Sequence, residues 1–338
     1  MTKERGVART AASSHAARWD CLDVLKLLAC LLITNSHCRA IYPWYFLAIG
    51  GGHGNGLFFI ISGFLLANIR LSFGEWIKKR VRRILPATLF FALVSVFLTE
   101  GLASMRALGF AGAGLLLINK YWFAAAIMLY YPVFYLVFSS ETRNTAWLSL
   151  FVYGFGYALL YLFAVDKTVF SVEPEGFAPF KVYFYFGVML VGGLMRRILD
   201  ERGEGNAPER EKSVRFASLV TAAAAFALGA AVYALITLKG QGLSAQFLIH
   251  AGVMAFSVAA LRTAYTFRTV QLPDSAVSRF VRLASASTLE IYLVQVTILP
   301  YVTGLPFPLN WAAFFAAAFA GGILAHSVAE RIRVRRSA

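Results

Sequence analysis

The chain has 338 residues, of which 59% are hydrophobic and only 14% are charged, and its mean hydropathy is +0.66. Soluble domains carry about 25% charged residues. The apolar runs here repeat with little polar alternation, which excludes a soluble enzyme and indicates a protein that crosses a membrane many times. Three cysteines in this length exclude a secreted disulfide scaffold. The formal charge of +15 does not indicate nucleic-acid binding, because the basic residues lie between apolar runs.

Ten apolar stretches are long enough to cross the hydrocarbon layer, which takes about 20 helical residues. We therefore expect an all-α, polytopic membrane helix bundle. A further apolar piece at 107–118 is shorter and rich in Gly and Ala, so it is expected to be a re-entrant or interfacial segment. A cytoplasmic tail at 1–21, a membrane domain at 22–330 and a basic cytoplasmic tail at 331–338 complete the organisation. The expected spans lie near 22–41, 54–70, 82–100, 121–139, 146–165, 180–196, 215–237, 243–262, 283–303 and 309–329.

The basic residues predict the orientation, because Lys and Arg near span ends are retained on the cytoplasmic side. With ten spans and the N-terminus inside, 26 of the 32 Lys and Arg residues are cytoplasmic and 6 are outside. The outer segment 164–180 also carries three acids. This distribution predicts that both termini are cytoplasmic. The six outer basic residues are Arg39, Arg106, Lys120, Lys167, Lys181 and Lys239.

Two polar residues of the first span lie on one face of the expected helix. Lys26 and His37 are eleven residues apart, which is three turns plus about 20° and about 16.5 Å along the axis. A cation near the cytoplasmic end and an imidazole near the outer end suit a long donor that enters from the cytoplasm with an anionic head. The alternative is that Lys26 anchors the span by its charge and that His37 is an interfacial histidine.

A basic cluster precedes the third span, with six Lys and Arg residues between positions 70 and 83. Arg80 and Arg83 are three residues apart and share a helix face. Guanidinium groups match phosphate oxygens bidentately, so the pair is a candidate site for a phosphate-bearing ligand on the cytoplasmic side. The alternative is a topology signal that contacts the headgroups of anionic membrane lipids.

Five further residues are candidates for supporting or acceptor-side roles. Ser62 precedes a glycine in mid-span, where close helix packing is the simpler interpretation. Trp122 belongs either to an outer aromatic belt or to a stacking platform for a sugar ring. Glu290 is the one acid well inside a span, suited to a buried polar pair or to chemistry, and Tyr292 follows it. His53, in a glycine-rich outer turn, is a second candidate polar contact.

In their order, these pieces resemble the acyltransferase-3 family of integral membrane O-acyltransferases. No single motif is specific, but the ordered set covers most of the chain. The resemblance implies transfer of an acyl group, usually acetyl from cytoplasmic acetyl-CoA, to a hydroxyl of a cell-surface polysaccharide or a lipid-linked glycan. The segments that carry it are LDVLKLLACLLITNSH (22–37), GLFFIISGFLL (56–66), WIKKRVRRILP (76–86), YWF (121–123), YFYFGVMLVGG (183–193), STLEIYLVQ (287–295) and AERIR (329–333).

The resemblance also implies roles for individual residues. His37 corresponds to the family's catalytic histidine, and Lys26 to a basic residue that is usually Arg. Arg80 and Arg83 correspond to an Arg-x-x-Arg signature. The donor phosphates are therefore expected near Lys26, Arg80 and Arg83, with His37 as general base or transient acyl carrier. Gln295 stands where the family pattern often ends in His, so no acid–base role is assigned to it.

The expected location is a bacterial-type cytoplasmic (inner) membrane. Acetyl-CoA serves as donor substrate, and neither a metal nor nucleic acid is expected. No extracytoplasmic hydrolase-like domain follows the tenth span, so we expect the membrane-only form of the family, which relies on glycan-biosynthesis partner proteins for some acceptors. Two other classes fit the residues alone. A secondary transporter or glycan-lipid flippase would use intramembrane charges as coupling sites, and only Glu290 qualifies. A non-catalytic membrane scaffold would need none of these groups for chemistry.

Overall fold

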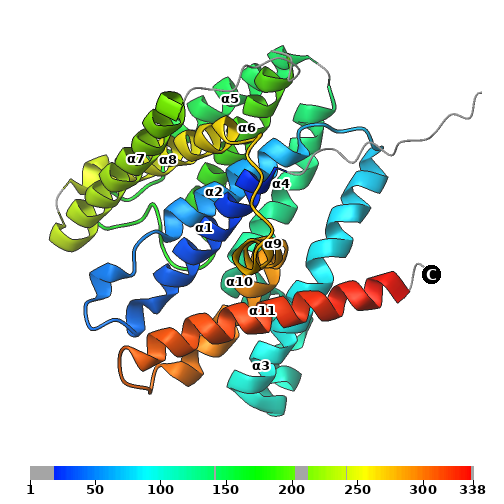
Figure 1. Ribbon diagram of the computed structural model, residues 1–338. Helices are drawn as coiled ribbons and strands as arrows, with labels where there is room; N and C mark the ends of the chain where they lie inside the picture. The colour runs from blue at the N-terminus through cyan, green and yellow to red at the C-terminus, as the bar shows by residue number, and fades with distance from the viewer. Residues whose placement is uncertain (1–18, 141, 202–211, 241, 336–338) are drawn as a thin grey trace, which may run out of the picture.

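The computed structural model describes residues 19–140, 142–201, 212–240 and 242–335, and within these ranges the regular elements are helices without any strand (Figure 1). Short 3₁₀ turns occur in the connections. The α-helices are α1 (Asp20–His37), α2 (Gly51–Leu66), α3 (Phe73–Lys120), α4 (Trp122–Ser139), α5 (Arg143–Phe163), α6 (Pro179–Glu201), α7 (Lys212–Lys239), α8 (Phe247–Thr266), α9 (Ala276–Ala286), α10 (Thr288–Val302) and α11 (Leu309–Arg335).

Nine candidate spans in the described ranges are long and apolar enough to cross a membrane, and α9 together with α10 makes a tenth if that bent pair counts as one span. The expected all-α polytopic bundle of about ten spans is thereby confirmed. The cytoplasmic location of both termini stays a prediction from the distribution of basic residues.

The ninth expected span is not a continuous helix. α9 and α10 meet at Ser287 with a bend of 77°. The Ser287 hydroxyl donates to the Leu283 carbonyl at 2.8 Å, and the Ser287 N–H bonds to the carbonyls of Leu283 and Ala284 at 3.1 Å. Serine side chains that bond to nearby backbone compete with helix continuation. The break places the start of α10 in the interior of the bundle.

The apolar piece at 107–118 is not a separate re-entrant segment, because it continues α3. This helix runs unbroken for 48 residues from Phe73 to Lys120, which is about 72 Å at 1.5 Å per residue. Its candidate span ends at Leu98. No proline follows Pro86 in the helix, and the many Ala and Leu residues favour helix enough to offset the glycines.

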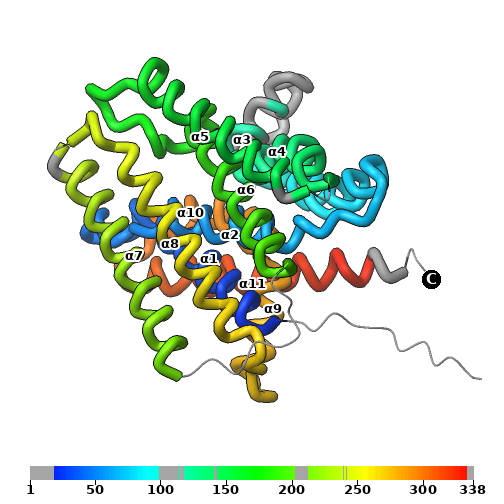
Figure 2. Tube along the Cα trace, turned by 90° about the horizontal axis from the view of Figure 1, so that it is seen from above, coloured from blue at the N-terminus to red at the C-terminus, as the bar shows by residue number. Residues whose placement is uncertain are grey.

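α1 and α2 form the middle of the bundle (Figures 1 and 2). α2 packs on α6 and α8, whereas α1 packs on α9 and α10. α3 packs on both α4 and α10, and α4 packs on α5 and α6. α1, α2, α4, α6 and α10 therefore enclose the interior, while α5 and α7 expose most of their apolar side chains, as expected for helices that face lipid.

α2 and α6 approach closely because glycines face the backbone of the opposite helix. A Cβ at Gly63 would clash with the carbonyl of Met189, and a Cβ at Gly192 would clash with the carbonyl of Ile60. Small residues at such positions are typical of membrane helix pairs. The prediction of close helix approach at the Ser62–Gly63 step is confirmed.

Replacing Gly63 by alanine is therefore expected to destabilise the protein. The added methyl group must displace the backbone of α6, and overpacking of this kind typically costs about 1–3 kcal/mol. The measurement is the midpoint of thermal unfolding of purified protein in detergent. Gly154→Ala on α5 is the matched control, because a Cβ there meets nothing within 4 Å. Equal midpoints for the two variants would contradict the close approach.

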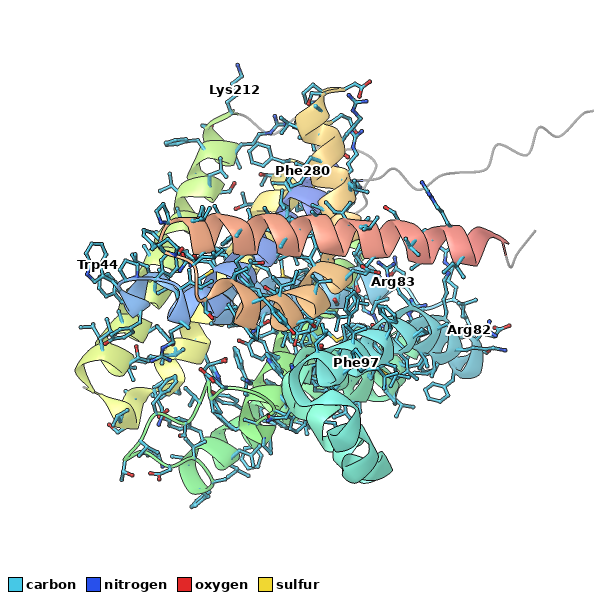
Figure 3. The ribbon with its side chains drawn as sticks, turned by 90° about the horizontal axis from the view of Figure 1, so that it is seen from below. Trp44, Arg82, Arg83, Phe97, Lys212 and Phe280 are labelled. Carbon is cyan, nitrogen blue, oxygen red and sulfur yellow. The ribbon has the colours of Figure 1, made fainter. Side chains whose placement is uncertain are left out.

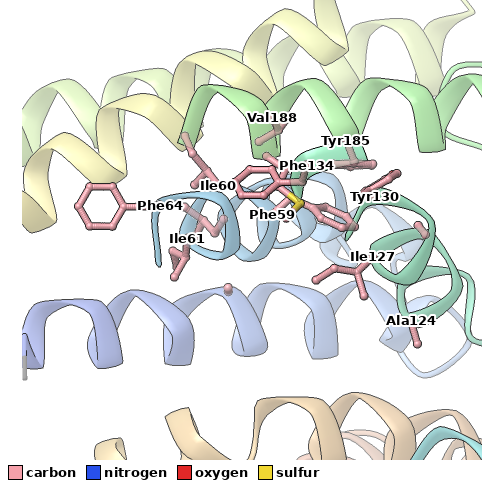
Figure 4. Packing of buried hydrophobic residues seen from close by; sticks show 14 of the residues in the cluster. Phe59, Ile60, Ile61, Phe64, Ala124, Ile127, Tyr130, Phe134, Tyr185 and Val188 are labelled. Atoms are coloured by element: carbon pink, nitrogen blue, oxygen red, sulfur yellow. The ribbon is translucent and has the colours of Figure 1, made fainter. Parts of the chain in front are cut away.

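Large buried side chains fill the space between α2, α4 and α6 (Figure 4). The ring of Phe59 lies 5.3 Å from that of Tyr130 and 5.2 Å from that of Tyr185. Ile60 and Phe134 are fully buried beside them. Interiors packed in this way deform little, so this core holds α2 in place while its opposite face looks toward α1 and the cavity described next.

Candidate active site

A cavity of about 330 Å³ lies between α1, α2, α3, α4 and the α9–α10 break. Its lining combines three kinds of side chain. The basic residues are Lys26, Lys79, Arg80 and Arg83; the hydroxyl-bearing residues are Ser62, Tyr131, Ser285, Thr288 and Tyr292; and the apolar residues are Ile33, Phe58, Ile61, Leu65, Leu66, Ile84, Phe123, Ile127 and Leu289. Five of the residues singled out in the sequence therefore share one cavity: Lys26, Ser62, Arg80, Arg83 and Tyr292.

The third and fourth turns of α3 supply the arginine side of the cavity. Arg80 lies over the buried ring of Trp76, with its guanidinium carbon 4.5 Å from the ring centroid, an arrangement that favours a fixed cation. Arg82 and Arg83 are both exposed, but Arg83 lines the cavity and Arg82 does not. Figure 3 shows Arg82 at the edge of the molecule and Arg83 closer to the bundle. The helical spacing predicted this difference.

Lys26 is positioned beside two acidic residues of α1 that also contact α9. The Asp23 carboxylate lies 3.8 Å from the Lys26 ammonium and accepts a hydrogen bond of 2.6 Å from Ser285. One turn earlier, Asp20 pairs with Arg282 at 2.9 Å. Both acids are buried. The sequence indicated neither partner, because the serine and the arginine lie more than 250 residues away in the chain.

Aromatic side chains close the inner end of the cavity. The ring of Phe123 lies 5.8 Å from that of Phe58 and 5.6 Å from that of Tyr292, and Ile33 completes this end. His37 follows Ile33 by four residues, or about 6 Å along α1, and is not part of the lining. A group that moves from the cavity to His37 must therefore pass this aromatic layer.

His37 ends α1, and its side chain is partly exposed. Its Nδ1 atom is buried and has no hydrogen-bond partner among the described residues. The Gln295 amide of α10 adjoins the imidazole, and Glu175 from the outer connection between α5 and α6 is the charged group whose field reaches it. At least one nitrogen of the imidazole therefore faces protein.

Three other candidates, Trp122, His53 and Glu290, do not line this cavity. The ammonium of Lys181 lies 4.1 Å from the ring centroid of Trp122, so a cation covers part of this ring. His53 was expected in a glycine-rich turn, but α2 already begins at Gly51, so His53 lies in the first turn of that helix. It is buried between the rings of Phe226 and Phe256, at 4.9 and 5.3 Å, on the side of α7 and α8.

Glu290 is joined to α11 rather than to the basic cluster. Its carboxylate lies 3.2 Å from Nδ1 of His326. The sequence left a buried polar pair and a direct role in chemistry open for Glu290, and this contact favours the pair. His326 could not have been named from the sequence, because only the packing of α10 against α11 brings the two residues together.

The connection between α5 and α6 is held in place by buried polar groups that the sequence did not reveal. The amide of Gln246 bonds to the backbone of Asp166, Val169, Ser171 and Val172 at 2.9–3.1 Å. These four bonds use both the oxygen and the nitrogen of the amide, so the connection is held at several points of its backbone.

Charged groups of the same connection are also fixed. The Glu173 carboxylate accepts a bond of 2.8 Å from Tyr185 and lies 3.3 Å from Nε2 of His250. Hydrogen bonds from the Thr168 hydroxyl and N–H lower the pKa of the exposed Asp166 carboxyl, which therefore stays ionised at neutral pH. Across the described ranges, no group of three His, Cys, Asp or Glu residues could hold a metal ion.

The chain belongs to the acyltransferase-3 family: the family model, described as an acyltransferase domain, matches residues 19–328. The match covers most of the chain and includes the cavity and His37, so the resemblance drawn from the ordered motifs is confirmed. The protein is a multi-pass membrane acyltransferase. Searches of curated proteins and of solved structures found no match.

Proposed function

We propose that the protein moves an acyl group, most simply acetyl, from cytoplasmic acyl-CoA to a hydroxyl of a cell-surface or lipid-linked glycan. The observation that carries this proposal is the cavity, in which four basic side chains adjoin an apolar interior that leads toward His37. The family indicates the reaction class, and the lining of the cavity suits a donor that is anionic at one end and apolar at the other.

The basic residues suit the phosphates of coenzyme A. Arg80 and Arg83 offer planar donor groups that match phosphate oxygens, and Lys79 and Lys26 add point charges. The pantetheine arm would then follow the cavity for part of the distance of about 16.5 Å that separates Lys26 from His37 along α1. The inner end carries no cation, so an uncharged acyl group is favoured over a dicarboxylic one, whose free carboxylate would be buried unpaired.

Beyond the aromatic end of the cavity, His37 carries the chemistry. As general base, it takes the proton of the acceptor hydroxyl while the oxygen attacks the thioester carbon and the CoA thiolate leaves. As transient acyl carrier, it attacks the thioester itself and then passes the acyl group to the hydroxyl. Both routes need neutral imidazole. Trp122 and His53 remain proposed acceptor-side residues, although neither lines the donor cavity.

The proposed location is a bacterial-type cytoplasmic membrane, with both termini and the donor site on the cytoplasmic side. The excess of Lys and Arg assigned to that side supports this orientation. The acceptor would be reached from the outer side, where glycan-biosynthesis partner proteins could present it.

Release of CoA thiol from acetyl-CoA by membrane vesicles that hold both the protein and its glycan tests this function. Acetyl-CoA does not cross membranes, so inside-out vesicles are expected to release thiol and right-side-out vesicles are not. Succinyl-CoA is expected to react far more slowly than acetyl-CoA. A transporter or flippase would release no thiol in either orientation, and that result would refute the proposal.

A further inference from the structure

The interface of α1 and α10 holds polar atoms that protein interiors rarely leave unsatisfied. Both amide atoms of Gln295 and the Nδ1 atom of His37 are buried without a hydrogen-bond partner among the described residues. Gln295 is 1% exposed, so bulk solvent does not reach its amide. More than nine in ten buried polar groups in native structures are paired. The presence of three unpaired atoms in Gln295 and His37 therefore needs an explanation.

The two side chains adjoin each other. α1 packs on α10, and the Gln295 amide is the hydrogen-bonding group next to the His37 ring. The surrounding outer end is closed by Cys38, Val302 and Phe314, which are apolar or weakly polar and buried. A hydrogen bond between Oε1 and Nδ1 would therefore satisfy one buried atom of each side chain.

A glutamine has specific consequences at this position. Its amide oxygen accepts a hydrogen bond from Nδ1–H, which leaves Nε2 with a free lone pair, because the partner of one ring nitrogen decides the tautomer of the imidazole. Unlike a carboxylate, the amide carries no charge that would stabilise the imidazolium. Unlike a second histidine, it does not titrate, so its hydrogen bonding is independent of pH.

We propose that Gln295 is a positioning residue that holds His37 in the Nδ1–H tautomer and leaves Nε2 as the reactive nitrogen. The inference rests on the proposed role of His37 in acyl transfer. It adds that the tautomer is set from α10, by a residue that the sequence assigned no acid–base role. Gln295 itself touches neither donor nor acceptor.

Nitrogen NMR of the full chain in lipid nanodiscs tests this directly, because the two tautomers have distinct ¹⁵N signals. The protein is labelled with ¹⁵N-histidine, and the His37 signals are assigned by their loss in His37→Ala. At alkaline pH the wild-type protein is expected to show protonated Nδ1 and unprotonated Nε2 at this residue. Protonated Nε2 would overturn the proposal, whether or not any variant folds.

Variants then separate positioning from packing. Gln295→Leu keeps the volume but lacks the acceptor, so the His37 signals are expected to shift toward a tautomer mixture. Its kcat for acetyl-CoA is expected to fall about 10–100-fold, the range for loss of an orienting partner, with KM unchanged. Gln295→Glu restores an acceptor oxygen and should restore the Nδ1–H tautomer.

Thr297→Val is the matched control. This variant removes a buried polar atom of the same helix, the Thr297 hydroxyl, which like the Gln295 amide is without a hydrogen-bond partner among the described residues. The His37 signals are expected to stay in place. Unchanged signals in Gln295→Leu would contradict the proposal. Failure of CoA thiol release in the wild-type protein would instead refute the proposed function. The tautomer measurement does not depend on activity, so it tests the role of Gln295 separately.

Discussion

Replacing His37 by alanine is expected to abolish acyl transfer while leaving the protein inserted and folded. The side chain lies at the last residue of α1, and the Gln295 amide is the hydrogen-bonding group beside its imidazole, so little of the fold depends on it. Loss of an acid–base group typically lowers the rate about 10²–10⁴-fold. The measurement is glycan acylation together with CoA thiol release, normalised to the amount of protein in the membrane.

The pH dependence provides a second observable for the same residue. Protonated imidazole can neither accept a proton nor attack a thioester, so activity is expected to decline as the pH falls through the range in which histidine becomes charged. His326→Ala is the control for loss of an imidazole elsewhere, because His326 lies beside Glu290 and does not line the cavity. Near-normal acylation by well-inserted His37→Ala protein would refute the mechanism and direct attention to His53.

Replacing Arg83 by alanine is expected to weaken donor binding more than replacing Arg82. Both residues are exposed, but Arg83 lines the cavity and Arg82 does not. Loss of one hydrogen bond to a charged group costs about 1.5–3 kcal/mol, which corresponds to about 10–150-fold in affinity. The measurement is the Kd of purified protein for a thioether analogue of acetyl-CoA, which binds but does not react.

Arg82→Ala is the matched control, since it removes the same charge from the same helix. Arg80→Ala is expected to resemble Arg83→Ala in binding, but it also removes the contact with Trp76, so its stability must be measured in parallel. Lys26→Arg is expected to be tolerated, because the charge stays beside Asp23. Equal losses at positions 80, 82 and 83 would indicate a diffuse electrostatic effect instead of a phosphate site.

The spans, the shared face of the two arginines and the family could be predicted from the sequence, because each depends on local patterns of residues. A membrane imposes a minimum length on each apolar run, so most spans could be placed close to the helices observed, although the second, third and ninth begin earlier than expected, at Tyr45, Phe73 and Ala276. The helical period places Arg80 and Arg83 on one face and Arg82 on another, and the cavity lining agrees. The ordered motifs were sufficient to predict the family.

Features that depend on contacts between distant segments could not be predicted in this way. Residues of α1 meet Arg282, Ser285 and Gln295 only because the chain folds back on itself, and no local period records that meeting. The same holds for the break at Ser287, where a pattern of hydropathy indicates only an apolar run. Hydropathy measures the preference of each residue for lipid or water, whereas a hydrogen-bond partner is a property of two positions. The cavity, its aromatic end and the partner of His37 are therefore results of tertiary packing.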